Sequence, residues 1–248
     1  MKSQEIAFLS VDNLEGFENA SLNNGEWELY VKEGELAAIG TKQCIEICKQ
    51  HGISIYEIFD KHPRGHILFV ANYKNKKPFD TITYEEVSLR TEEDNRIGER
   101  AAFTLKELQA FLKEVGQATL RRDHCIEGTQ WVELMPPLEP SDFSIRIPKG
   151  TAPVSSGYSG FEKTNLDQIL QEQGKKTLLM GGVATDYCVG QTALDGVDLG
   201  YEVYLVEEAI RGVAPETTQA TIQKMTAKWV KIITIAELAE LLSKNLNQ

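Results

Sequence analysis

Long hydrophobic runs are missing from this sequence of 248 residues. No window approaches the ~20 apolar residues that a membrane-spanning helix needs. The N-terminal stretch 1–17 is interrupted by Asp12 and lacks the cleavage pattern of a secretory signal peptide. We therefore expect a cytoplasmic protein without a membrane segment.

Positive charge is scarce. Lys and Arg number 26 against 37 Asp and Glu, which gives a net charge of −11. This balance disfavours nucleic acid or an anionic membrane surface as a partner. Internal repeats and low-complexity tracts are absent as well. The length then favours one large α/β domain over two small ones.

Cysteine is rare, with four residues at Cys44, Cys48, Cys125 and Cys188. Without an export signal these thiols are expected to be reduced rather than paired. Cys44 and Cys48 stand four positions apart in a helical pattern, so we expect them to pack in the core. Cys125 and Cys188 remain as candidates for chemistry.

Short apolar runs alternate with helical patterns along most of the chain. The runs are apolar throughout rather than at every second residue, which is typical of strands buried on both faces. The sequence therefore predicts a three-layer α/β/α fold around a mainly parallel, roughly six-stranded sheet. The expected strands are 6–11, 53–59, 142–147, 177–183, 202–207 and 230–234, and the expected helices are 33–52, 166–175, 185–200, 215–227 and 235–246.

One stretch does not follow this alternation. Residues 71–130 contain no clear strand, although 104–116 has a helical pattern. We interpret about 71–123 as an insertion into a single domain that spans 1–248.

Polar residues stand where several of the predicted strands end. Asp12 follows the first strand, Asp60 and His62 follow the second, Lys149 the third and Cys188 the fourth. In open parallel sheets, ligands bind beyond the carboxyl ends of the strands. Each residue also has an ordinary structural explanation taken alone, but core packing does not account for their convergence on one edge.

His62 and Asp60 could bind a metal together with His124. The first two are two positions apart, so both can point to one side of an extended segment, and His124 lies in a polar loop. One carboxylate and two imidazoles suit Zn²⁺, Fe²⁺ or Mn²⁺. An Asp-x-His pattern is also common by chance, so both interpretations stay open at this point.

Cys188 follows two glycines at a predicted strand-to-helix turn. A helix N-terminus and a nearby Lys149 would both lower the pKa of a thiol, and the N–H groups of the turn could bind an oxyanion. Cys125 competes because a histidine precedes it, but sequence neighbours seldom face each other. We therefore favour Cys188 as the nucleophile.

The combined motifs resemble those of the nicotinamidases, a group of the isochorismatase-like cysteine hydrolases, over nearly the whole chain and in the same order. The segments that carry the resemblance are FLSVDNLEGF (8–17), DKHPRGH (60–66), DHCIEGT (123–129), PKGTAPVSSGYSGF (148–161), GGVATDYCVGQTALDG (181–196) and GYEVYLVEEAIRGV (200–213). The resemblance implies an amidohydrolase that converts nicotinamide to nicotinic acid and ammonia in NAD salvage.

The same resemblance implies a catalytic triad of Asp12, Lys149 and Cys188. It also implies a cis peptide bond before Ala184, and an oxyanion hole formed by the backbone N–H groups of Ala184 and Cys188. Turnover would pass through a thioester on Cys188.

A divalent metal ion is implied as the cofactor, with Zn²⁺ the first choice and Fe²⁺ or Mn²⁺ as alternatives. Its ligands would be Asp60, His62 and His124, with His66 as a fourth ligand or a supporting group. By the same resemblance the metal would hold the pyridine nitrogen and so position the ring.

The chain departs from the pattern of these relatives in the substrate pocket. Arg121 stands where they usually have a tryptophan wall, while Phe17 and Tyr187 are the other expected pocket residues. Arginine can stack on a pyridine ring but also attracts anions. Two alternatives therefore remain: the same chemistry on another small amide or carbamoyl compound, or a metal-binding or redox module without catalysis. The expected partner is a small amide, and self-association stays open.

Overall fold

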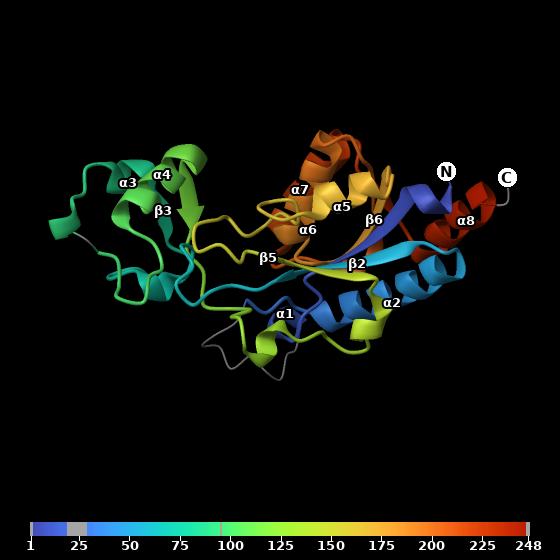
Figure 1. Ribbon diagram of the computed structural model, residues 1–248, viewed down its shortest axis with the longest axis horizontal. Helices are drawn as coiled ribbons and strands as arrows, with labels where there is room; N and C mark the ends of the chain where they lie inside the picture. Colours follow the sequence, from blue (N-terminus) through green and yellow to red (C-terminus); the bar gives the residue numbers. More distant parts are fainter. Residues whose placement is uncertain (1, 19–28, 95, 247–248) are drawn as a thin grey trace.

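A six-stranded parallel sheet lies at the centre of the molecule (Figure 1). The computed structural model describes residues 2–18, 29–94 and 96–246. The strand order is β5-β2-β1-β6-β7-β8, and each neighbouring pair is parallel. The strands are β1 (Ile6–Val11), β2 (Ser54–Asp60), β5 (Ile145–Lys149), β6 (Thr177–Val183), β7 (Glu202–Arg211) and β8 (Lys231–Ile233).

Helices cover both faces of this sheet. Helices α2 (Gly34–Gln50) and α8 (Ile235–Leu246) pack on one face, and α5 (Leu166–Glu172), α6 (Cys188–Asp198) and α7 (Pro215–Ala227) pack on the other. The predicted three-layer α/β/α fold is confirmed. No helix in the described part of the chain is long and apolar enough to cross a bilayer.

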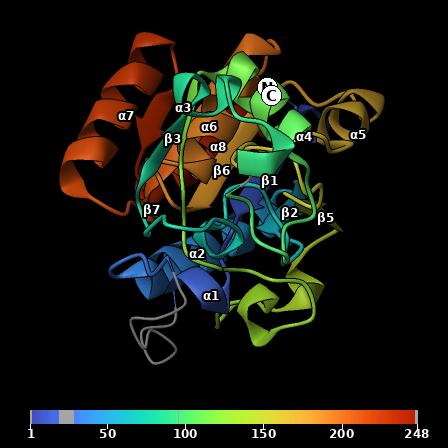
Figure 2. The same ribbon diagram turned by 90° about the vertical axis from the view of Figure 1, so that its left-hand side faces the viewer.

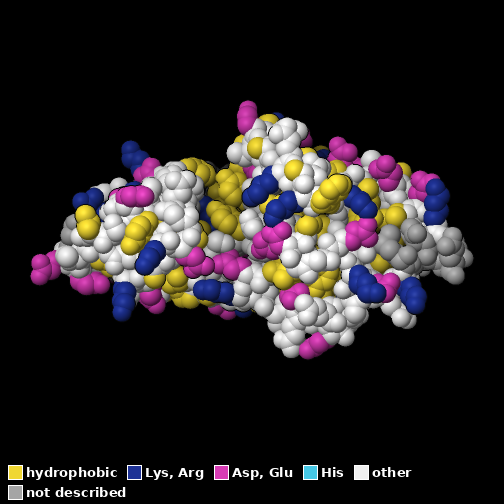
Figure 3. All heavy atoms as spheres, turned by 90° about the horizontal axis from the view of Figure 1, so that it is seen from above, with side chains coloured by type: hydrophobic (Ala, Val, Ile, Leu, Met, Phe, Trp, Pro, Cys, Tyr) yellow, Lys and Arg dark blue, Asp and Glu magenta, His cyan; other side chains and the backbone are white. Residues whose placement is uncertain are grey.

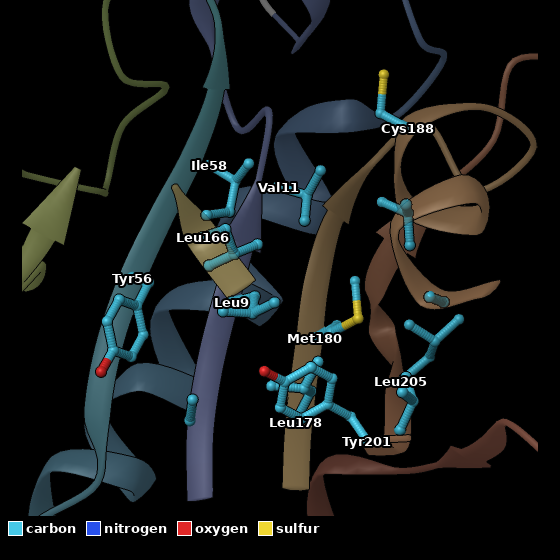
Figure 4. Close-up of a cluster of buried hydrophobic side chains, with 14 of the residues drawn as sticks. Leu9, Val11, Tyr56, Ile58, Leu166, Leu178, Met180, Cys188, Tyr201 and Leu205 are labelled. Atoms are coloured by element: carbon cyan, nitrogen blue, oxygen red, sulfur yellow. The ribbon is translucent and has the colours of Figure 1, made fainter. Parts of the chain in front are cut away.

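Strand β1 shows why the strands are apolar throughout. Its side chains alternate between two cores, with Leu9 and Val11 facing α5 and α6, and Phe8 facing α2. Every residue of β1 is buried. Figure 4 shows Cys188 at one end of the first of these cores, beyond Val11.

The described residues of 71–123 form a lobe beyond one end of the sheet (Figures 1 and 2). The lobe contains β3 (Thr81–Thr83), α3 (Tyr84–Ser88), α4 (Leu105–Val115) and β4 (Gln117–Thr119), and β3 pairs antiparallel with β4. The expectation of no strand here was wrong. Each strand has three residues and its partner is far away in sequence, so neither leaves a periodic pattern. The lobe shares a separate apolar core with Ile67 and Leu68, which lie just before it in the chain.

Strand β5 begins later than predicted. The expected strand 142–147 is observed as Ile145–Lys149, because Pro140–Asp142 forms a 3₁₀ turn instead. The Asp142 carboxylate accepts hydrogen bonds from Lys42 and Lys49 at 2.8 Å and from the backbone N–H of Glu139 at 3.0 Å. These contacts tie the start of β5 to α2.

Replacing Asp142 by asparagine is expected to destabilise the fold by about 1–2 kcal/mol at pH 7. Burial opposes ionisation of Asp142, but the two lysines outweigh it and hold the pKa of this carboxyl below its usual value. The stabilisation is therefore present above the unfolded-state pKa of about 4 and is lost as the pH falls through the lower, native value.

Urea unfolding of both proteins as a function of pH measures this effect. The two free energies of unfolding should differ at pH 7 and converge in acid. Asp198→Asn is the matched control. Asp198 forms an ion pair with Lys228, but both side chains are solvent-exposed, so this substitution should leave the free energy of unfolding unchanged. A difference for Asp142→Asn that persists in strong acid would contradict the ion-pair explanation.

Candidate active site

Four neighbouring strands deliver polar side chains to the carboxyl edge of the sheet. Lys149 and Asp60 are the last residues of β5 and β2, Asp12 directly follows β1, and Cys188 lies beyond β6 as the first residue of α6. All four are buried. The structure thus brings together the residues that the sequence places at strand ends.

The ammonium of Lys149 is the centre of this cluster. Its Nζ lies 2.8 Å from Asp12 Oδ2, 2.6 Å from Asp60 Oδ1 and 3.3 Å from Cys188 Sγ. It also donates to the carbonyl of Gly157 at 2.9 Å. One buried cation therefore contacts two carboxylates and the thiol at once.

The backbone around Asp12 holds it against the neighbouring strands. Asp12 has a positive φ of 52°, its N–H donates to Ile58 O, and its Oδ1 accepts the N–H of Asp60 at 2.7 Å. On the other side, β6 approaches β1 so closely that a Cβ at Gly182 would lie 1.8 Å from the carbonyl oxygen of Val11. Only glycine fits there, and the close approach keeps the end of β6 beside Asp12.

Charge is distributed unevenly over the two carboxylates. Burial, followed by repulsion from Asp60, raises the pKa of Asp12 to about 7, although Lys149 opposes both effects. Burial also acts to raise the pKa of Asp60, but the nearby His62 and Lys149 outweigh it and hold the value well below the usual range. Burial acts to lower the pKa of Lys149, and the two carboxylates raise it far above normal. Asp60 and Lys149 are therefore ionised, and Asp12 is poised near neutrality to exchange a proton.

The expected low pKa of Cys188 was wrong. Cys188 is the first residue of α6, as the sequence suggested, but burial raises its thiol pKa well above normal and outweighs the attraction of Lys149. A hydrogen bond to the Asp12 carboxylate acts in the same direction as burial. The resting group is a thiol beside a base, so forming the thiolate requires proton transfer to that base.

Three ligand atoms converge on the other side of Asp60. Those of Asp60, His62 and His124 all lie within 4.8 Å of one another, and the three side chains are fully buried. Asp60 Oδ2 is 3.2 Å from His62 Nε2 and 3.9 Å from His124 Nε2. Within the described residues, none of these three atoms has a hydrogen-bond partner.

The tautomers explain why these atoms need a cation. His62 Nδ1 lies 2.9 Å from the carbonyl of Gly150, and His124 Nδ1 lies 2.8 Å from the carbonyl of Arg122. In the neutral form of each imidazole, the nitrogen facing a carbonyl carries the proton, which leaves the Nε2 lone pair free beside the Asp60 carboxylate. Backbone carbonyls that orient the imidazoles in this way are typical of metal sites. The three residues therefore fit a divalent cation.

His66 lies beside this group but is engaged elsewhere. Its ring centroid is 4.6 Å from that of His62. Its Nδ1 accepts from Leu68 N–H at 3.3 Å, and its Nε2 is 3.2 Å from the hydroxyl of Ser155. Both ring nitrogens thus have protein partners, which suits a supporting group rather than a fourth ligand.

Gly150 offers a test of the metal group that does not involve turnover. It has a φ of 64°, and a Cβ there would lie 2.3 Å from His62 Cε1. We expect Gly150→Ala to displace His62 and to weaken zinc affinity by about 10–100-fold, as measured by competition with a chromogenic chelator. Gly174→Ala is the control, because Gly174 has a φ of 66° and open space around it. Equal zinc affinity in the two variants would argue against His62 as a ligand.

A cavity opens over Cys188. The three pocket residues expected from sequence, Phe17, Arg121 and Tyr187, all line it together with Cys188. The sequence did not identify Phe79 and Tyr158, which also line it. The sequence offers little to identify them: Phe79 follows a Lys-Pro pair, and Tyr158 lies within a segment rich in serine and glycine. The lobe contributes to this wall, and on the face seen from above, hydrophobic side chains gather where the lobe meets the sheet domain (Figure 3).

The turn before α6 provides backbone donors at the floor of the cavity. The Val183–Ala184 peptide is cis, as the resemblance implies. Across the described ranges, the N–H groups of Ala184 and Cys188 have no acceptor, whereas Thr185 N–H and Tyr187 N–H are bonded to Arg211 O and Ala184 O. Two unpaired donors beside the thiol can stabilise an oxyanion.

The remaining cysteines are structural. Cys44 and Cys48 are buried in the core between α2 and the sheet, as predicted, and burial raises the pKa of Cys44 to about 12. Cys125 is also fully buried, and burial raises its thiol pKa far above normal. None of them lines the cavity over Cys188.

Comparisons with known proteins agree with this arrangement. The model of the isochorismatase domain matches residues 40–237. The chain is 30% identical over 210 residues to a nicotinamidase of Acinetobacter baylyi, an alignment that covers 81% of this chain and 85% of the relative.

Solved structures of a nicotinamidase/pyrazinamidase and of a pyrazinamidase are also similar to this chain. A nicotinamidase/pyrazinamidase from Acinetobacter baumanii has a TM-score of 0.75 and 27% identity, with 95% of this chain and 98% of that chain covered. A pyrazinamidase of Pyrococcus horikoshii, solved in complex with zinc, has a TM-score of 0.65 and 29% identity, with 93% and 99% covered. On the extent of the domain match and of these alignments, the chain belongs to the isochorismatase family.

Proposed function

We propose that this protein hydrolyses nicotinamide to nicotinic acid and ammonia, a reaction of NAD salvage. The relatives named nicotinamidase in the comparisons support the substrate. The observation that carries the chemistry is the contact of Lys149 with both Asp12 and Cys188 at the floor of an aromatic cavity. No binding module needs this combination of acid, ammonium and thiol.

In the proposed mechanism Asp12 removes the proton from Cys188 while Lys149 stabilises the resulting thiolate. The sulfur attacks the carboxamide carbon, and the backbone N–H groups of Ala184 and Cys188 stabilise the oxyanion. Asp12 then gives its proton to the departing ammonia, which leaves a thioester on Cys188. Asp12 next accepts a proton from water while the resulting hydroxide attacks the thioester. The C–S bond then breaks, nicotinic acid leaves, and Asp12 returns its proton to the Cys188 sulfur, which restores the thiol and the carboxylate.

Asp60, His62 and His124 would hold one divalent ion, with Zn²⁺ the first choice and Fe²⁺ or Mn²⁺ as alternatives. A zinc complex of a related pyrazinamidase supports this choice. The bound ion would supply a coordination position for the ring nitrogen, which orients the substrate. The ring itself would lie between Phe17 and Tyr187, the aromatic walls of the cavity.

Ammonia release from nicotinamide by the zinc-loaded protein tests this proposal. We expect turnover that falls at least tenfold, mainly through a higher KM, when a chelator strips the metal, and that returns when Zn²⁺ is added back. Zinc binding without release of ammonia from any amide would instead support the non-catalytic metal-binding alternative. The proposal places the reaction in the cytoplasm, in agreement with four free thiols.

A further inference from the structure

Arg121 is a buried cation that the proposed mechanism does not use. It is 4% exposed and lines the cavity over Cys188. Its backbone is fixed on both sides, because its N–H donates to Leu68 O and its carbonyl accepts from Val70 N–H, each at 2.8 Å. The backbone of Arg121 is therefore held against residues 68–70 on both sides rather than lying in a free loop.

The guanidinium is only partly satisfied by the protein. Nη2 donates to the carbonyl of Ser156 at 2.9 Å, and the guanidinium carbon lies 4.4 Å from the centroid of the Tyr158 ring. The Nε–H is buried and has no acceptor within the described chain. A buried charged donor without a partner is costly, and a ligand that supplies an acceptor removes that cost.

No carboxylate of the described residues forms an ion pair with Arg121. The nearby Asp12 and Asp60 are both within ion-pair distance of Lys149, and Asp60 Oδ2 faces His62 and His124. Within the described chain, Arg121 thus has no ion-pair partner of its own, although burial acts to lower its pKa and the nearby Asp60 acts to raise it. A planar guanidinium with free N–H groups pairs best with a carboxylate.

We propose that Arg121 is a specificity-determining residue that makes the cavity select planar aromatic amides carrying a carboxylate on the ring. The inference rests on the proposed amidase function and narrows its substrate class. The carboxamide is placed at Cys188, the ring between the aromatic walls, and the carboxylate against Arg121. A neutral carboxamide such as nicotinamide is then hydrolysed without using this contact.

The test compares nicotinamide with the positional isomers of pyridine carboxamide that bear one ring carboxylate. For the wild-type protein we expect at least one isomer to exceed nicotinamide in kcat/KM by about tenfold or more. Arg121→Gln should lower the ratio of kcat/KM for that isomer to kcat/KM for nicotinamide by about 30-fold or more, because only the carboxylated substrate loses an ionic contact. Arg121→Lys keeps the charge but lacks the planar guanidinium, so its kcat/KM for the carboxylated isomer should lie between those of wild type and Arg121→Gln.

A charge-matched control and a binding measurement separate recognition from folding. Arg90→Gln removes a cation of the same lobe that pairs with Glu86, and it should leave the substrate ratio unchanged. Calorimetry on Cys188→Ala, with and without Arg121→Gln, should show the same loss of affinity for the carboxylated amide in the absence of turnover. Thermal unfolding of each variant identifies any that fail to fold.

Two results would overturn the inference. One is a wild-type protein that prefers nicotinamide over every carboxylated isomer, which needs no variant to interpret. The other is an equal fall in kcat/KM for both substrates in Arg121→Gln. That result would mean that Arg121 only supports the positions of Ser156 and Tyr158. In both cases hydrolysis of nicotinamide would leave the proposed function intact, whereas hydrolysis of no amide would remove the function itself.

Discussion

Replacing Cys188 by alanine is expected to abolish ammonia release from nicotinamide, with kcat lowered by about 10⁴-fold or more. The variant keeps the cavity and the metal group but removes the only sulfur that lies beside Lys149, at 3.3 Å, within the described structure. Because Cys188 lies at the end of a core, loss of the sulfur costs little packing, and the thermal midpoint should change by only a few degrees.

Steady-state ammonia release and intact-protein mass spectrometry measure this prediction together. The wild type should accumulate an acyl adduct when the reaction is quenched in acid, and Cys188→Ala should not. Cys44→Ala is the matched control, because Cys44 is equally buried but lies on the opposite side of the sheet. Turnover by Cys188→Ala within tenfold of wild type would exclude thioester chemistry.

The catalytic edge could be predicted from sequence because parallel strands impose a direction. Asp12, Asp60, Lys149 and Cys188 each stand at the carboxyl end of an apolar run, and all-parallel pairing brings those ends together. The strand order sets β5, β2, β1 and β6 side by side, which is why one lysine reaches both carboxylates and the thiol. The prediction of the sheet did not require an alternation of apolar and polar residues, since continuous apolar runs already indicate a sheet covered on both faces.

The electrostatics of the edge could not be predicted in the same way. The position of Cys188 at a helix N-terminus was correct, but the direction of its pKa shift depends on how deeply the thiol is buried. Burial results from packing against both neighbouring layers and leaves no local signal. Tyr158 and Phe79 were missed for a related reason, because they reach the cavity from irregular segments, which leave no periodic pattern in the sequence.

Replacing Asp12 by asparagine is the second large effect that we expect, with kcat/KM lowered by about 10³–10⁴-fold. Asparagine can still accept the N–H of Asp60 through its carbonyl oxygen, so the local backbone is retained. Its NH₂ group, however, would face the ammonium of Lys149 in place of Oδ2 at 2.8 Å, and it cannot accept the proton of Cys188. The thiol, whose pKa burial already raises, then has no base to ionise it.

The reactivity of the Cys188 thiol distinguishes a role of Asp12 as the base from a merely structural role. The rate at which iodoacetamide alkylates Cys188 should fall with turnover in Asp12→Asn, since both require the thiolate, whereas zinc affinity should change far less. Asp142→Asn makes the same chemical change at the start of β5, remote from the thiol, and should leave alkylation and turnover at wild-type rates. If Asp12→Asn is alkylated as fast as wild type but does not turn over, Asp12 acts only in the later proton transfers to ammonia and from water. If it also turns over at the wild-type rate, Lys149 alone is sufficient to activate the thiol and Asp12 is not the base.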